Sequence, residues 1–244
     1  MQQPLKKIII ERLQREILDL EGFKTKAQHA QPKLGLKTLE DNFPNQTFPT
    51  GTIHEFISEK PEHRACTSAF ISGVLTKLNN QNGVYIWIAK QKQLFPVGLR
   101  KFGIQPHQII FINLVKPKDI LWATEEALKC KSLSGVISEL EDITFAQSQR
   151  LQLTVEKSKV TGFILRTQTD RINATACAAR WQIKPLTSEN KERLPGVGFA
   201  KWQVDLLKVR NGNTASCIIT YHHGELAVIE TANNYPFTHQ AIGS

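Results

Sequence analysis

Residues 57–68 stand where nucleotide-binding proteins often place a phosphate loop. They read ISEKPEHRACTS and lie between a β-rich run, GTIHEF, and an apolar helical run, AFISGVLTKL. A phosphate loop needs glycines that free consecutive N–H groups, a lysine for the terminal phosphates and a Ser or Thr for the metal ion. This stretch has no glycine and no Lys-Ser or Lys-Thr pair, and Pro61 removes one N–H donor. The position is that of a phosphate site, but the phosphate-binding groups are absent.

Catalytic groups are also missing from the strand ends that follow. Hydrolysis of a nucleotide would call for a carboxylate after the run VYIWIA, yet residues 85–101 contain no Asp or Glu. Glu139, Glu141 and Asp142 cluster at the end of GVISEL and could hold Mg²⁺, although a solvated acidic helix start is the favoured interpretation. No Ser-His-Asp, Cys-His or paired-carboxylate arrangement stands out. We therefore expect a non-catalytic protein without a cofactor.

A metal site is not expected either. The four cysteines, Cys66, Cys130, Cys177 and Cys217, are far apart and form no C-x-x-C pair. Zinc sites need clustered Cys or His ligands, and the adjacent His222 and His223 should point to opposite faces of a strand. The favoured interpretation is four small buried thiols in a reducing cytoplasm.

The chain is basic, with a net charge of +9 and a pI near 9.4, which permits attraction to nucleic acid or to an acidic partner. Residues 150–210 hold 12 Lys and Arg against 5 Asp and Glu. A basic face for DNA or a partner is one hypothesis, and a solvated face without a ligand is the favoured alternative. The candidate residues are Arg166, Arg171, Arg180, Lys184, Lys201, Lys208 and Arg210.

Periodicity divides the chain into four parts. Residues 1–22 predict an amphipathic helix, 23–50 a polar linker with three prolines, 51–230 the main domain and 231–244 a flexible tail. No apolar run approaches the ~20 residues that span a bilayer, and the start of the chain does not have the pattern of a signal peptide. We therefore expect a cytoplasmic protein that does not enter a membrane.

The main domain alternates short apolar strands with helices, which is typical of an α/β fold with a parallel sheet flanked by helices. After Asn173 the runs ACAARWQI, KWQVDLLKV and TASCIITYH are β-rich, and Asn211-Gly212 is a hairpin signal. An antiparallel C-terminal extension is therefore expected. The predicted strands are 52–56, 84–89, 109–112, 135–140 and 162–167, and the predicted helices are 66–78, 95–103, 119–131 and 144–159.

The order of these elements resembles the RecA core. HEFISEKPEHRACTSAFI lies without gaps over that family's strand, phosphate loop and helix. The match places Ser58 and His63 at the loop glycines, Arg64 at the lysine and Ala65 at the threonine. The family's catalytic glutamate falls near Gln91. The resemblance therefore implies a RecA-like fold that has lost both the loop and the catalytic glutamate.

LPGVGFAKWQVDLLKVRNG (194–212) resembles a characteristic segment of ImuA-type proteins, which are RecA-like and SulA-like members of bacterial mutagenesis cassettes. This resemblance implies an accessory of error-prone translesion DNA synthesis in the SOS response to DNA damage, acting by protein–protein interaction. The implied partners are a Y-family-like polymerase (ImuB type), an error-prone replicative-type polymerase subunit and RecA itself. Pro195, Phe199 and Trp202 are candidate docking residues, with a core role for Trp202 as the alternative.

The connections that match RecA's two DNA-binding loops are short here, at residues 140–145 and 169–173. We therefore expect any DNA binding to be weak, electrostatic or indirect, while self-association stays open. Two further hypotheses remain. One is an unconventional ATPase that uses Arg64 and Glu139, and the other is a SulA-like inhibitor of the division tubulin.

Overall fold

The computed structural model describes residues 33–79, 83–91, 94, 96–167, 172–188, 198–222 and 224–231 of the 244-residue chain. These residues form one sheet in the strand order β3-β2-β4-β5-β1-β6-β7-β8-β9. The strands are β1 (Ile53–Ile57), β2 (Tyr85–Ala89), β3 (Ile109–Asn113), β4 (Gly135–Leu140), β5 (Gly162–Arg166), β6 (Ala179–Leu186), β7 (Ala200–Val209), β8 (Ala215–His222) and β9 (Glu225–Thr231). The helices are α2 (Lys37–Glu40), α3 (Pro61–Asn79), α4 (Pro96–Arg100), the 3-10 turn η1 (Pro106–Gln108), α5 (Pro117–Lys129) and α6 (Phe145–Ser158).

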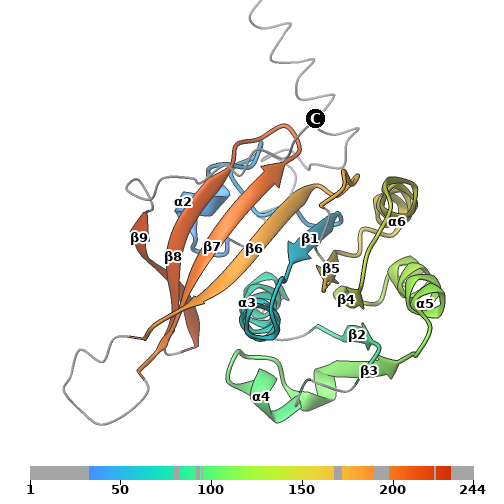
Figure 1. Cartoon of the computed structure of the whole chain (residues 1–244), viewed down its shortest axis with the longest axis horizontal. Coiled ribbons are helices and arrows are strands. Elements are labelled where there is room, and N and C mark those ends of the chain that lie inside the picture. Colours follow the sequence, from blue (N-terminus) through green and yellow to red (C-terminus); the bar gives the residue numbers. More distant parts are fainter. Residues whose placement is uncertain are drawn as a thin grey trace, which may run out of the picture.

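The sheet is mostly parallel, as the sequence predicts. Strands β1 to β6 pair in parallel, and β6 to β9 pair in antiparallel fashion. Helix α3 lies on one side of the parallel strands, while α5 and α6 lie on the other (Figure 1). Every residue of β1 and β5 is buried, because these central strands are covered on both faces. The predicted α/β fold with an antiparallel C-terminal extension is confirmed.

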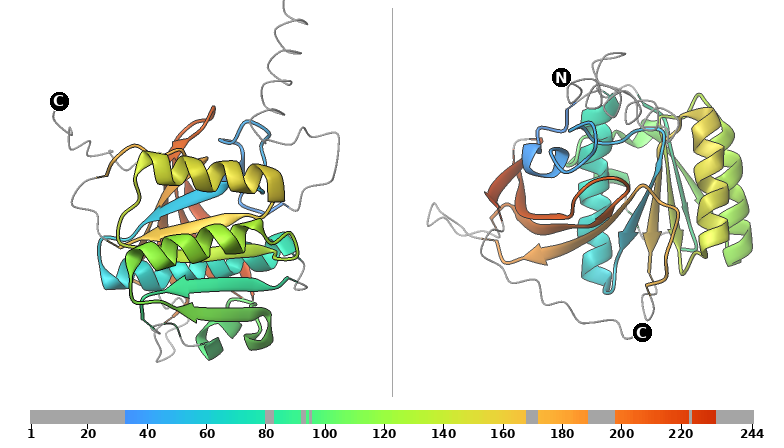
Figure 2. Two further views of the ribbon diagram at one scale, coloured as in Figure 1. Left: turned by 90° about the vertical axis from the view of Figure 1, so that its right-hand side faces the viewer. Right: turned by 90° about the horizontal axis from the view of Figure 1, so that it is seen from above.

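The antiparallel strands bend around α3, which lies between them and the parallel part of the sheet (Figure 2). Residues 66–75 of α3 are consequently all buried, as expected for a helix that is covered on every side. Its polar side chains find partners within the helix: Ser72 Oγ donates to the Ser68 carbonyl at 2.7 Å, and Ser68 Oγ donates to the Arg64 carbonyl at 2.9 Å. A helix with serines in its sequence can therefore fill the centre of the core.

The predicted linker at 23–50 is wrong over its described part, residues 33–50. Leu36 is fully buried, and Phe43 and Phe48 are 2% and 1% exposed within the core on the α3 side of the sheet. The short helix α2 orients these side chains, and Glu40 accepts the Leu34 backbone N–H at 2.8 Å. In sequence this stretch resembles a linker for two reasons. It contains prolines and polar residues, and the spacing of its apolar residues fits neither a regular helix nor a strand.

Helix α3 begins at Pro61, five residues before the predicted start. Proline is favoured in the first turn of a helix, where its missing N–H has no partner to lose. The predicted helix at 1–22 and nearly all of the predicted tail at 231–244 lie outside the described residues. None of the helices in the described residues is long and apolar enough to cross a membrane.

Candidate functional site

The stretch that resembles a phosphate loop is mostly helix. Only residues 58–60 separate the end of β1 from the start of α3, so His63, Arg64 and Ala65 lie in the first turns of the helix. The Ser58 N–H donates to the Arg166 carbonyl at 3.0 Å, and the Ser58 hydroxyl lies 3.3 Å from that of Thr67. Because this backbone is committed to helix and sheet, it does not form the open ring of N–H groups that cradles a phosphate.

Arg64, which takes the place of the phosphate-binding lysine, faces a carboxylate. Its Nη1 lies 3.6 Å from Glu139 Oε2 on β4. The Trp87 indole N–H donates to the other oxygen of Glu139 at 2.9 Å. Burial raises the pKa of the Glu139 carboxyl, and the Trp87 hydrogen bond and the charge of Arg64 oppose that rise. The Arg64 charge is therefore balanced within the protein.

A cavity of about 180 Å³ lies beside this pair at the carboxyl ends of β2 and β4. A second ion pair stands at its rim, with Lys90 Nζ 3.0 Å from Glu141. Each cation is matched by a carboxylate, so a polyphosphate entering here would meet negative charge as well as positive. The volume is also below the ~300–1,000 Å³ of typical ligand pockets. The cavity lining includes Arg64, Lys90, Gln91, Glu139, Glu141 and Thr167.

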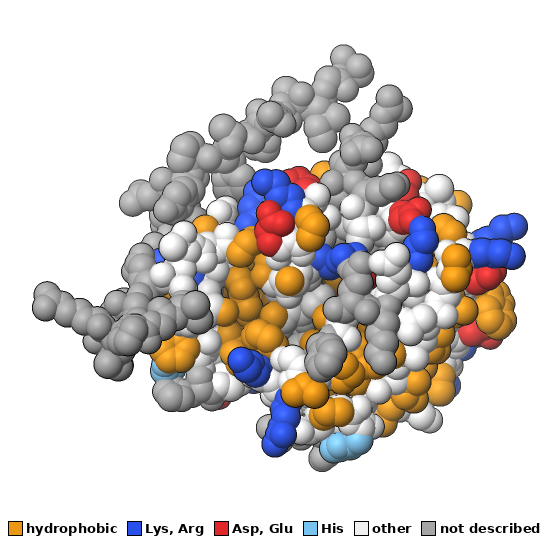
Figure 3. All heavy atoms as spheres, turned by 60° about the horizontal axis from the view of Figure 1, so that its bottom comes forward, with side chains coloured by type: hydrophobic (Ala, Val, Ile, Leu, Met, Phe, Trp, Pro, Cys, Tyr) orange, Lys and Arg blue, Asp and Glu red, His pale blue; other side chains and the backbone are white. Residues whose placement is uncertain are grey.

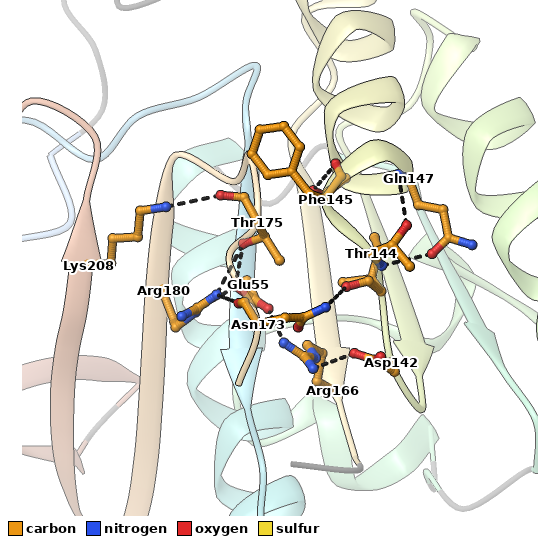
Figure 4. Close-up of polar contacts among 12 residues, drawn as sticks. Glu55, Asp142, Thr144, Phe145, Gln147, Arg166, Asn173, Thr175, Arg180 and Lys208 are labelled. Atoms are coloured by element: carbon orange, nitrogen blue, oxygen red, sulfur yellow. Dashed lines mark hydrogen bonds and ion pairs between the residues drawn. The ribbon is translucent and has the colours of Figure 1, made fainter. Parts of the chain in front are cut away.

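Among the predicted basic residues, Arg166 is a core residue and not part of a surface. Its side chain is fully buried, and its Nη1 donates to Glu55 at 2.9 Å while its Nη2 bonds Asp142. Glu55 also accepts hydrogen bonds from Arg180 Nε at 2.7 Å and from the Thr175 hydroxyl at 2.8 Å (Figure 4). The prediction of a basic face is therefore wrong for Arg166, because β5 turns this side chain toward a buried carboxylate.

The other described members of that predicted face, apart from Arg180, are divided between two places. Lys208 and Arg210 lie at the end of β7, where they donate to the carbonyls of Thr175 (3.0 Å) and Ala176, respectively. Lys201 lies at the start of β7, seven residues or about 23 Å from Lys208 at the rise of a strand. Lys184 is on β6, near Lys201, and is half-buried. Arg171 is outside the described residues.

The predicted docking residues are also divided. Trp202 is 4% exposed and packs in the core with its ring centroid 5.9 Å from that of Phe102. The docking hypothesis is therefore wrong for Trp202, and its core alternative is confirmed. Phe199 is 55% exposed, and its ring packs edge-to-face against that of His222, with the ring centroids 3.9 Å apart. Pro195 lies outside the described residues.

The sequence reasoning missed a groove beside α6. Its volume is about 410 Å³, and it lies between α6, residues 175–177 and the end of β7. Phe145 and Leu153 stand exposed along it, while Leu151 and Val155 of the same helix are buried in the core. Apolar residues on two faces of one amphipathic helix were the available signal. The residues that line the groove are Phe145, Gln149, Gln152, Leu153, Glu156, Thr175, Ala176, Cys177, Lys208 and Arg210.

A second apolar area surrounds the edge strand β3. Ile110 is 51% exposed, Val115 76% and Trp122 63%. Figure 3, which brings the α4 and β3 side of the molecule forward, shows hydrophobic side chains spread over this face. Exposed apolar area of this kind is typical of surfaces that bind other proteins.

Among the described residues, no group of three or more His, Cys, Asp or Glu could hold a metal ion. Cys66, Cys177 and Cys217 are buried as expected, and burial raises the pKa of each thiol to about 12. These thiols are therefore unreactive at neutral pH. Cys130 is exposed, so the expectation of a buried thiol is wrong there; it follows the last residue of α5, where the helix ends at the surface.

The sequence was compared with known proteins. No family model matches the chain. Protein ImuA of Caulobacter vibrioides is 25% identical over 197 residues, which cover 76% of this chain and 81% of ImuA. Cell division inhibitor SulA of Edwardsiella piscicida is 23% identical over 133 residues, covering 54% of this chain and 79% of SulA. SulA of Klebsiella aerogenes is 26% identical over 118 residues, covering 48% and 69%. The chain is thus a protein related to ImuA and SulA.

Proposed function

We propose that this protein is a non-catalytic accessory of DNA damage-induced mutagenesis that acts in the cytoplasm by binding other proteins. The similarity to Protein ImuA over 76% of the chain is the observation that carries the proposal. The resemblance in sequence to ImuA-type proteins supports error-prone translesion synthesis in the SOS response as the process. The partners proposed on the same ground are an ImuB-type polymerase, an error-prone replicative-type polymerase subunit and RecA.

The geometry at the former phosphate position supports a non-catalytic role. Helix α3 begins where the loop would be, and Arg64 is paired with Glu139. Nucleotide hydrolysis depends on a loop that cradles the phosphates, a metal ion and a group that positions water. The exposed Phe145 and Leu153 in the groove beside α6 and the apolar area at β3 support a role in binding proteins instead.

The cellular test is deletion of the gene followed by measurement of mutation frequency after ultraviolet damage. We expect damage-induced mutation to fall to the undamaged background and to return with the wild-type gene. An Arg64→Gln variant should restore it equally, provided that immunoblots show the same protein level. Unchanged induced mutation in the deletion strain would contradict the proposed process.

The biochemical test of the non-catalytic role is a thermal-shift titration with Mg-ATP together with an ATP turnover assay. A ligand that binds the folded state raises the unfolding temperature, so we expect no shift and no turnover. ATP turnover that Arg64→Ala abolishes would instead support the unconventional ATPase.

A second candidate function is inhibition of cell division, because two proteins named Cell division inhibitor SulA are similar to about half of this chain. Overexpression in the source organism distinguishes the two. A SulA-like protein would produce filamentous cells without DNA damage, whereas an accessory of mutagenesis would leave cell length unchanged.

A further inference from the structure

The α6 wall of the groove carries two exposed apolar side chains among polar ones. Phe145 is 52% exposed and Leu153 is 53% exposed, and both line the groove. Eight residues of helix separate them, which corresponds to about 12 Å along the axis. About half of each side chain stays exposed, and neither belongs to the core face of α6, which Leu151 and Val155 supply. They provide two apolar contact points at a fixed spacing.

The opposite wall is basic. Lys208 and Arg210 line the groove from the end of β7, and Figure 4 shows Lys208 and Phe145 on either side of the Thr175 segment. Both cations donate to backbone carbonyls, but neither forms an ion pair with a carboxylate of the described chain. Arg180, in contrast, forms an ion pair with Glu55. The wall therefore carries positive charge that a partner's carboxylate can balance.

The floor of the groove is fixed before any partner binds. The Ala176 N–H donates to Ser148 Oγ of α6 at 2.9 Å, and Asn173 Nδ2 donates to the Ile143 carbonyl at 3.0 Å. Thr175 is tied to the buried Glu55 by its hydroxyl and to Lys208 by its carbonyl. A preorganised groove loses little conformational entropy on binding, which favours affinity.

A peptide suits this groove better than single-stranded DNA does. DNA binding needs a positive track along the backbone and several aromatic platforms. The groove offers two cations and one exposed ring, and Glu156 adds a negative charge to its lining. A segment with apolar side chains and a nearby carboxylate matches both walls at once.

We propose that this groove docks a segment of the ImuB-type polymerase that carries two apolar residues about 12 Å apart and at least one carboxylate. The inference rests on the proposed function, because that function supplies the polymerase as partner. The apolar pair sits on Phe145 and Leu153, and the carboxylate faces Lys208 and Arg210.

The test is isothermal calorimetry of the full chain with the purified ImuB-type polymerase from the same organism. We expect Leu153→Glu to weaken binding about 30-fold, as for a central interface contact. Lys208→Gln should weaken it about five-fold and reduce its salt dependence. Val115→Glu, an equal change at an exposed apolar residue near β3, should bind as wild type. Thermal unfolding checks each variant, and Leu153→Ala replaces Leu153→Glu if the latter unfolds.

The outcomes distinguish failure of the groove proposal alone from failure of the proposed function. If all groove variants bind the polymerase as tightly as the wild type does, the groove proposal is overturned and the proposed function stands. If only Val115→Glu loses binding, the interface lies near β3 and the groove proposal is overturned. No binding by the wild type overturns both proposals. Binding of a dT oligonucleotide that Leu153→Glu and Lys208→Gln abolish, with polymerase binding unchanged, assigns the groove to DNA.

Discussion

Among individual residues, Glu55 has the largest structural role that the sequence did not indicate. It is fully buried and forms ion pairs with Arg166, which is also fully buried, and with Arg180, which is 13% exposed, while Asp142 supplies a second carboxylate to Arg166. Together with Thr175 these groups link β1, β5, β6 and the segment that forms the groove floor. Some of the cationic side chains that suggested a DNA-binding face are therefore paired with carboxylates inside the protein.

Removing this carboxylate should be costly. Glu55→Ala removes one of the two carboxylates that bond the buried Arg166 and leaves Arg180 without its ion pair, and we expect a loss of about 3–5 kcal/mol in the free energy of unfolding. Urea denaturation measures this directly. The matched control is Glu125→Ala, which removes the partner of the exposed Arg150 and should cost no more than about 1 kcal/mol. Equal losses in the two variants would contradict a central role for Glu55.

His54 should make stability depend on pH. It is buried, its Nε2 lies 2.8 Å from the Pro49 carbonyl, and its Nδ1 lies 3.3 Å from the Trp181 indole nitrogen. Burial lowers the His54 pKa from 6.5 to about 4. Between these values the unfolded chain binds a proton that the folded chain does not, so stability falls as the pH drops from 6.5 to 4.

The size of this effect is about 3 kcal/mol, which is the pKa difference at ~1.4 kcal/mol per unit. Urea unfolding at pH 7.5 and pH 4.5 tests it. A His54→Gln variant should be less stable at pH 7.5 but should lose less stability between the two values. A wild-type protein and variant with parallel pH profiles would show that His54 is not responsible.

Among the elements, residues 33–50 are an integral layer of the core. The Phe48 ring stacks on His54 at 4.3 Å and on Trp181 at 6.0 Å, and it is 1% exposed. We expect Phe48→Ala to destabilise the protein by about 3–5 kcal/mol in urea unfolding, as for other buried Phe to Ala changes. Lys37→Ala, an exposed change in α2, should stay within about 0.5 kcal/mol. A similar small effect of Phe48→Ala would restore the linker interpretation.

Across the whole molecule, the net charge of +9 overstates the capacity to bind DNA. Arg166 and Arg180 are balanced by Glu55 and Asp142, while Lys201 and Lys208 lie far apart on β7. Few phosphates can be contacted at once, so the affinity for single-stranded DNA should be weak. We expect a Kd no tighter than about 10 µM at physiological salt and a loss of about tenfold between ~50 and ~200 mM salt.

Fluorescence anisotropy with a labelled dT oligonucleotide measures this affinity. The Lys208→Gln variant should lower it only slightly, since no single cation dominates. A submicromolar Kd at physiological salt would mean that DNA is a direct ligand, and that residues outside the described part of the chain contribute to binding.

The sequence alone determined the order of strands β1 to β8 and of helices α3 to α6, because local periodicity and turn residues specify these elements. It also determined that the phosphate-binding groups are absent, since that chemistry requires particular residue types at fixed spacing. The tertiary structure decided the rest. Only pairing across β1, β5 and β6 turns Arg166 toward Glu55, and only packing against α3 buries Phe43 and Phe48. The groove beside α6 likewise joins residues more than 50 positions apart, which no local pattern brings together.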